Sequence, residues 1–138
     1  MIDAGTQLPP FEQRLTRENL VRYAAVSGDL NPIHYSDHAA RALGLPGVVA
    51  HGMMTMGVAL RAVTTWLGDP AGIRTYTAHF ARAVLVPDDG QGAVIHVEGT
   101  VTDVTEDTAT VTLVVTCRSA GAGDAAPVLT RVTVTVGR

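Results

Sequence analysis

The chain contains no lysine, and all ten of its basic residues are arginine. Its formal net charge is −3 and its pI is about 5.9, so it lacks the basic field that attracts nucleic acid or an anionic membrane. Its single cysteine, Cys117, excludes an internal disulfide and fits no metal-binding spacing. We therefore expect no nucleic-acid partner and no membrane association.

We also expect no secretory leader. The opening segment, MIDAGTQLPPFEQR, has neither the positive start nor the apolar run of a signal peptide. The most apolar stretch, VVAHGMMTMGVALRAVTTWL, carries His51 and Arg61, which favours a buried helix over a membrane span. With 46% hydrophobic and 17% charged residues, the composition is that of a globular protein. We expect one domain over residues 1–138, in a reducing cytoplasm.

Three helices are predicted in the first half of the chain. Residues 16–26 place Leu20, Tyr23, Ala24 and Val26 on one face, with Thr16 as N-cap and Gly28 as stop. A short helix covers DHAARAL, between Ser36 and Gly44. A longer helix runs from His51–Gly52 to WLGDP. It is apolar on nearly every face, so it must be surrounded by protein.

The second half of the chain has the alternating Val and Thr pattern of β-strands. Four strands are predicted in residues 73–86, 93–104, 109–117 and 128–136, separated by the turn sequences PDDGQG, TEDT and AGAGDAAP. Helices followed by an antiparallel meander make an α+β fold, with the sheet curled around the long helix. Such a sheet has open edges, and a dimer that extends it would close them.

The segment VSGDLNPIHYSD contains several polar side chains that can take part in catalysis. On a regular helix Asp29 and His34 would point about 140° apart, but Pro32 argues against a helix and presets a bend. In an irregular bend the two side chains can converge as a general acid–base pair, with Asn31 orienting the imidazole or bracing the bend. The alternative is an ordinary turn with His34 at the surface.

Gly52 favours the catalytic interpretation of this segment over an ordinary turn. It lies where the long helix is predicted to start, and the first N–H groups of a helix have no internal partner. A glycine there lets a substrate approach the backbone, so a developing oxyanion would be stabilised. The alternative is a glycine that merely begins a helix. The bend and the helix start together indicate proton abstraction next to a carbonyl, as in reversible loss of water from a 3-hydroxyacyl thioester.

The segment YAAVSGDLNPIHYSDHAA resembles the hydratase signature of the MaoC-like family of (R)-specific enoyl hydratases and 3-hydroxyacyl dehydratases. AHGMMTMG, WLGDP and VPDDG resemble segments of the HadB-type subunit of actinobacterial 3-hydroxyacyl-ACP dehydratase. The similarity runs from about residue 8 to residue 136. It implies a single, dimeric hot-dog fold, in which an antiparallel β-sheet wraps a long central helix.

The resemblance also implies residue roles. The catalytic pair would be Asp29 and His34, with Asn31 supporting the site and the Gly52 amide as oxyanion donor. In the dehydration direction we expect His34 to remove the C2 proton and Asp29 to protonate the departing hydroxyl, without a cofactor. Related sequences read RF where this chain reads His79–Phe80. If that arginine holds a phosphate-bearing carrier, Arg74 or Arg82 would have to replace it.

Other interpretations of these residues stay open. Hot-dog proteins also include acyl thioesterases, and a chain of this kind can be an acyl-binding subunit of a heterodimeric dehydratase. The substrate would be acyl-ACP or acyl-CoA, and the partner a second copy or a second hot-dog subunit. We expect no metal, because the cap at Ser36 breaks any helix that would join His34 to His38. His51 either lines the pocket or packs at the helix start.

Overall fold

The computed structural model describes residues 1–119 and 124–138. The predicted loop AGAGDAAP, residues 120–127, therefore lies partly outside the described residues. The strands are β1 (Phe11–Leu15), β2 (Ile73–Phe80), β3 (Ala93–Val104), β4 (Thr108–Ser119) and β5 (Ala126–Gly137). The helices are α1 (Arg17–Ser27), α2 (Asp37–Ala42) and α3 (Gly52–Leu67), with short 3₁₀ helices η1 (Pro32–His34) and η2 (Pro70–Gly72).

The three predicted helices are confirmed with their caps. Thr16 accepts a hydrogen bond from the Asn19 amide at the start of α1, and Ser36 accepts one from the Ala39 amide at the start of α2. Gly68 ends α3 in the left-handed conformation, with φ of 76°. On α1, Leu20 and Ala24 are buried, whereas the expected inward position of Val26 is wrong because that side chain is exposed.

All neighbouring strands of the sheet are antiparallel, in the order β1-β3-β4-β5-β2. The predicted meander is confirmed for β3, β4 and β5, which pair in chain order. β2 instead pairs with β5 at one edge of the sheet, so the segment after β2 crosses toward the opposite edge, where β3 lies beside β1. The predicted strand over residues 73–86 ends at Phe80. There the Ala81 amide binds the Val128 carbonyl and the chain leaves the sheet.

The short strand β1 was not predicted. Its five residues, FEQRL, alternate between partly or fully buried and exposed positions, and they pair with β3 from Phe11–Val97 to Leu15–Ala93. Two of the five are charged, which suits an edge strand but weakens the strand signal in the sequence.

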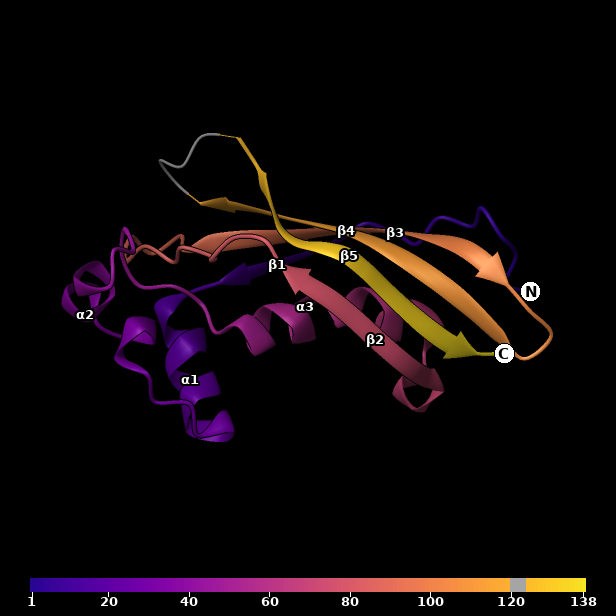
Figure 1. Cartoon of the computed structure of the whole chain (residues 1–138), viewed down its shortest axis with the longest axis horizontal. Coiled ribbons are helices and arrows are strands. Elements are labelled where there is room, and N and C mark those ends of the chain that lie inside the picture. Colours follow the sequence, from indigo (N-terminus) through magenta and orange to yellow (C-terminus); the bar gives the residue numbers. More distant parts are fainter. Residues whose placement is uncertain (120–123) are drawn as a thin grey trace.

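Helix α3 lies against one face of the sheet, with α1 and α2 at one end of it (Figure 1). The inward side chains of β3 include Ile95, Val97 and Val101, while His96 and Glu98 occupy the opposite face. The sheet covers only one side of α3, where Val58, Ala59 and Val63 are buried, and Met53 is 63% exposed. The expectation that α3 is enclosed on every side is therefore not met within one chain.

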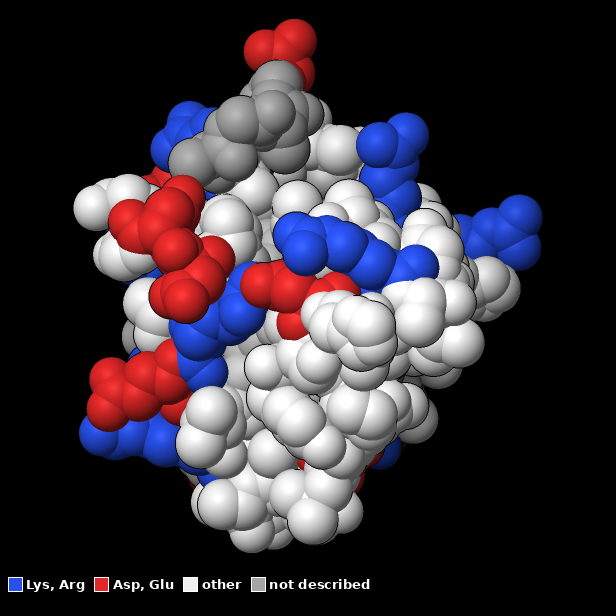
Figure 2. Space-filling model, turned by 90° about the vertical axis from the view of Figure 1, so that its left-hand side faces the viewer, with Lys and Arg blue, Asp and Glu red and all other residues white. Residues whose placement is uncertain are grey.

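Within the described residues, no helix is long and apolar enough to cross a membrane. On the end face shown in Figure 2, arginine side chains lie among aspartate and glutamate side chains rather than forming one basic field. The lower half of that face, where α1 and the segment after it lie in Figure 1, is mostly uncharged.

Candidate active site

The bend between α1 and α2 is built by short-range hydrogen bonds. Gly28 ends α1 with φ of 74°, and its amide binds the Ala24 carbonyl at 2.9 Å. The Asp29 Oδ1 atom accepts from the Asn31 amide at 3.2 Å, and the Asn31 side chain accepts from the Ile33 amide at 3.2 Å. Pro32 then starts η1 with its fixed φ. Two consecutive Asx turns therefore hold the loop in place.

This loop brings Asp29 and His34 together. The Asp29 Oδ2 atom lies 3.7 Å from the His34 Nε2 atom. The Asp29 side chain is 51% exposed, whereas His34 is buried. The two carboxylate oxygens thus have separate contacts, because Oδ1 braces the loop and Oδ2 faces the imidazole. Asn31 braces the bend, the second of the two roles considered for it.

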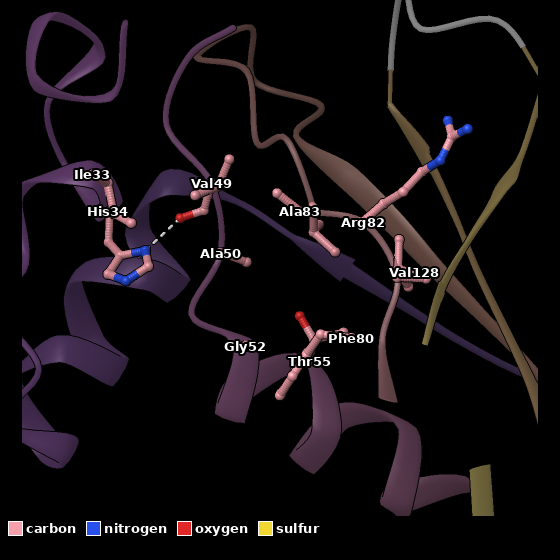
Figure 3. A pocket seen from close by; sticks show the side chains of 12 residues that line it. Ile33, His34, Val49, Ala50, Gly52, Thr55, Phe80, Arg82, Ala83 and Val128 are labelled. Atoms are coloured by element: carbon pink, nitrogen blue, oxygen red, sulfur yellow. Dashed lines mark hydrogen bonds between the residues drawn. The ribbon is translucent and has the colours of Figure 1, made fainter. Parts of the chain in front are cut away.

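A tertiary contact fixes the His34 ring. The His34 Nδ1 atom lies 2.7 Å from the Val49 carbonyl oxygen (Figure 3). Because a carbonyl oxygen only accepts, Nδ1 carries a hydrogen, and in the neutral ring the lone pair is on Nε2. The Val49 amide donates to the Ile33 carbonyl at 3.1 Å, so both backbone groups of Val49 are hydrogen-bonded to the segment that carries His34. The Nε2 atom of His34, which is the basic nitrogen of this tautomer, therefore faces Asp29.

A cavity of about 340 Å³ adjoins this base. His34 and Gly52 both line it, and Phe80 and Arg82 contribute from the end of β2 and the segment after it (Figure 3). Its volume is at the lower end of the range for small-molecule sites. Gly52 is the first residue of α3, as predicted. Asp29 and Asn31 are not among the lining residues, so Asp29 is connected to the cavity through His34.

The Phe80 ring gives Gly52 a packing role as well. A Cβ atom at Gly52 would lie 2.9 Å from the Phe80 Cε1 atom, closer than van der Waals contact allows. The absence of a side chain at residue 52 therefore lets an aromatic ring approach the start of α3. The amides of the first turn face this region, and the helix dipole adds partial positive charge there.

The structure adds a residue whose role the sequence left open. His51 is buried, its ring stacks on His34 with centroids 3.7 Å apart, and its Nε2 atom lies 3.2 Å from the Asp29 carbonyl oxygen. Burial lowers the pKa of His51, and the neighbouring His34 lowers it further, although the bond to the Asp29 carbonyl and the Asp29 charge oppose this. Its position beside Gly52 was the only sequence signal for this contact.

Asp29, His34 and His51 also bring potential metal-ligand atoms within 4.8 Å of one another. However, the two imidazole planes are inclined by only 22°, so their in-plane lone pairs point side by side rather than at one centre. The His34 Nδ1 and His51 Nε2 atoms already donate to carbonyl oxygens. These contacts favour acid–base chemistry over metal ligation. His38, the other histidine considered, is exposed on α2.

The two arginines considered for carrier binding lie at opposite ends of β2. Arg82 lines the cavity and its guanidinium extends away from the centre (Figure 3). Arg74 lies near the other end of the strand, against Gly137. Only Arg82 is therefore placed at the mouth of the candidate site.

Comparisons with known proteins agree with this arrangement. The MaoC like domain family matches residues 5–118. The chain is 43% identical over 83 residues to the 3-hydroxyacyl-thioester dehydratase X of Mycobacterium tuberculosis, covering 59% of this chain and 29% of the relative. A solved MaoC-like dehydratase superposes with a TM-score of 0.86 at 34% identity, covering 98% of this chain and 40% of that one. The chain thus spans less than half the length of either protein.

The (R)-hydratase from A. caviae involved in PHA biosynthesis has the same fold, with a TM-score of 0.77 at 21% identity. That match covers 98% of this chain and 96% of the hydratase. The predicted α+β hot-dog fold is thereby confirmed.

Proposed function

The chain belongs to the MaoC-like family, and from that premise we propose that it is a hydro-lyase that interconverts (3R)-hydroxyacyl and trans-2-enoyl thioesters. The observation that carries the proposal is the approach of Asp29 Oδ2 to His34 Nε2, at 3.7 Å, beside a cavity that reaches the start of α3. The similarity to a 3-hydroxyacyl-thioester dehydratase supports the same substrate class.

The proposed reaction moves two protons through the pair. In dehydration, neutral His34 takes the proton from C2, and the protonated carboxyl of Asp29 gives its proton to the hydroxyl leaving C3. Water departs, the C2–C3 double bond forms, and the pair ends as an imidazolium and a carboxylate. A proton passed from His34 to Asp29 restores the starting state, and hydration is the reverse. The steps balance without a redox cofactor.

Gly52 is proposed to stabilise the thioester oxygen. When C2 loses its proton, negative charge develops on that oxygen, and a free amide at the start of α3 would donate a hydrogen bond to it. This assignment requires the Phe80 ring, which packs beside Gly52, to leave room for the thioester. Asn31 contributes by holding the loop that carries Asp29.

The carrier is proposed to be CoA or an acyl carrier protein, with its phosphate near Arg82. The His79–Phe80 pair places no arginine at that point of β2, and Arg82 supplies the charge two residues later. We further propose that the chain works as a dimer, with a second copy or with another hot-dog subunit.

The test is water addition to crotonyl-CoA and to longer trans-2-enoyl thioesters on both carriers. Asp29→Asn and His34→Ala should each lower kcat by about 10²–10⁴-fold, the usual contribution of a general acid or base. The exposed residues Asp88 and His38 provide matched controls, Asp88→Asn and His38→Ala, which should retain parent activity.

Full activity in either site variant would remove the mechanism. Release of free thiol from a saturated acyl thioester, without hydration of the enoyl substrate, would replace the proposal with thioester hydrolysis. A chain that binds acyl thioesters, but whose complex with a second hot-dog subunit keeps full activity when Asp29→Asn or His34→Ala is introduced, would instead be an acyl-binding subunit.

A further inference from the structure

His51 holds the N-cap position of α3, yet its side chain does not cap the helix. N-cap positions favour Ser, Thr, Asp and Asn, whose side chains accept from the free amides of the first turn. The His51 imidazole instead turns into the protein and is 1% exposed. The first amides of α3 therefore have no side-chain cap from His51, and the imidazole ring makes its contacts inside the protein.

The buried ring touches three neighbours around the catalytic loop. Its Nε2 atom lies 3.2 Å from the Asp29 carbonyl oxygen. One face stacks on His34, and the Tyr23 ring of α1 meets it edge-on with centroids 4.8 Å apart. His51 therefore links the start of α3 to both members of the acid–base pair and to α1.

These contacts define the protonation state of His51. The hydrogen is on Nε2, because a carbonyl oxygen only accepts. The Nδ1 atom is buried and has no hydrogen-bond partner within the described residues. A proton placed there would have no acceptor, and the positive charge would lie against His34. The titratable groups facing the ring are Tyr23, Asp29 and His34, and burial, the largest effect, lowers the pKa of His51.

An imidazole with an unpartnered buried nitrogen is less favourable than an apolar side chain of the same size. Packing alone does not explain its presence at the start of α3. The bond to the Asp29 main chain and the stack on His34 are the two features that an aliphatic residue would lose.

We propose that His51 is a positioning residue for the acid–base pair, and that its neutral Nε2–H imidazole anchors the Asp29 main chain and gives His34 an uncharged face. This inference rests on the proposed hydro-lyase function. The anchor keeps Asp29 Oδ2 opposite His34 Nε2. The uncharged face matters because His34 becomes an imidazolium when it takes the C2 proton, and a second positive charge 3.7 Å away would oppose that step.

Two variants separate the anchor from simple packing. In His51→Gln the side-chain amide nitrogen reaches the position of Nε2, so the bond to Asp29 is kept without the ring. In His51→Phe the ring is kept without the bond. We expect kcat for enoyl-thioester hydration to fall less than roughly tenfold in the Gln variant and roughly 10²-fold in the Phe variant, with KM changed less than about threefold in both.

A purely structural role predicts the opposite order. Phenylalanine preserves the apolar packing, whereas glutamine buries a polar amide, so the Phe variant should then be both more stable and more active. Thermal unfolding of both variants is measured beside the kinetics, and His38→Gln, at an exposed histidine, is the matched control with parent kcat.

The protonation state is tested independently of activity. Long-range ¹H–¹⁵N spectra of the histidine rings should contain one Nε2–H imidazole whose pKa lies below the ordinary histidine value of 6.5, and that signal should vanish in His51→Gln. A His51 ring whose pKa lies at or above the ordinary value, or whose neutral form carries its hydrogen on Nδ1, would overturn the inference.

The kinetic outcomes keep the two proposals apart. A parent enzyme that hydrates enoyl thioesters while His51→Phe keeps full kcat would overturn the positioning role alone. A parent that hydrates none of the substrates would overturn the proposed function, and the positioning role with it.

Discussion

At the scale of single residues, Asp37 determines the shape of the segment that holds His34. Its Oδ1 atom accepts from the Val48 amide at 2.9 Å and from the Arg17 guanidinium at 2.9 Å. The Val48 carbonyl in turn binds the Val86 amide at 2.9 Å. The carbonyl that orients His34 belongs to the next residue, Val49. One carboxylate therefore supports the geometry of the base from outside the cavity.

Asp37→Asn should lower stability by about 1 kcal/mol at pH 7. This is less than the roughly 1.5–3 kcal/mol of a hydrogen bond to a charged group, because the side chain is 35% exposed. The Val48 amide, and then Arg17, hold the pKa of Asp37 below its ordinary value of 3.8. The stabilisation is therefore complete above that value and is lost as the pH falls through the lower folded-state pKa.

Urea unfolding of Asp37→Asn and the parent from about pH 7 to pH 3 tests this prediction. The difference between their free energies of unfolding should shrink only below about pH 4. The exposed Glu18–Arg22 pair provides the control: Glu18→Gln should change stability by less than about 0.5 kcal/mol. A difference in free energy of unfolding between Asp37→Asn and the parent that stays constant over this pH range would contradict the stabilising role of the Asp37 carboxylate.

At the scale of elements, the end of α1 decides where the catalytic loop starts. Gly28 adopts φ of 74°, and a Cβ there would meet no atom within 4 Å. Any loss of stability caused by a side chain at residue 28 therefore comes from strain in the backbone. Because Asp29 follows directly, the left-handed turn also sets the direction from which the carboxylate approaches His34.

Gly28→Ala should destabilise the protein by about 1 kcal/mol, because an alanine is strained in the left-handed conformation. Gly28→Asn should lose clearly less, since asparagine tolerates that conformation. Chemical denaturation of both variants measures the difference. A loss for Gly28→Asn equal to or larger than that for Gly28→Ala would contradict the assignment to backbone strain.

At the scale of the whole molecule, one edge of the sheet and one side of α3 are left uncovered in a single chain. The edge strand β1 is five residues long and carries two charges, whereas β2 is eight residues long and ends at the exposed Phe80. Met53 is exposed on α3 beside Gly52, which Phe80 contacts. This apolar area lies beside the outer edge of β2, which pairs with no further strand of the described residues, and it supports the proposed dimer.

Met53→Glu should weaken that dimer by about 3 kcal/mol, or roughly 100-fold in Kd, because a charge would be buried in the interface without a partner. Val114, 58% exposed on β4, is the matched control, and Val114→Glu should leave assembly unchanged. Light scattering over a dilution series measures both. A parent that stays monomeric at high concentration would contradict the dimer.

Local sequence signals predicted the helices and most of the sheet. Capping residues at Thr16 and Ser36 and glycines at Gly28 and Gly68 fix helix ends through neighbouring backbone groups, so they can be recognised without a tertiary structure. Alternation gave the long strands for the same reason. It failed at residues 81–86, whose buried Val84 and Val86 pair with residues 48–50 rather than with the sheet.

For the site, the sequence by itself determined the bend that joins Asp29 to His34, because Gly28, Asn31 and Pro32 act within a few residues of one another. Only the tertiary structure decided the order of strands, the tautomer of His34 and the stacking of His51 upon it. Those features depend on groups distant in the chain, such as the Val49 carbonyl, and which distant groups meet is set by packing of the whole core.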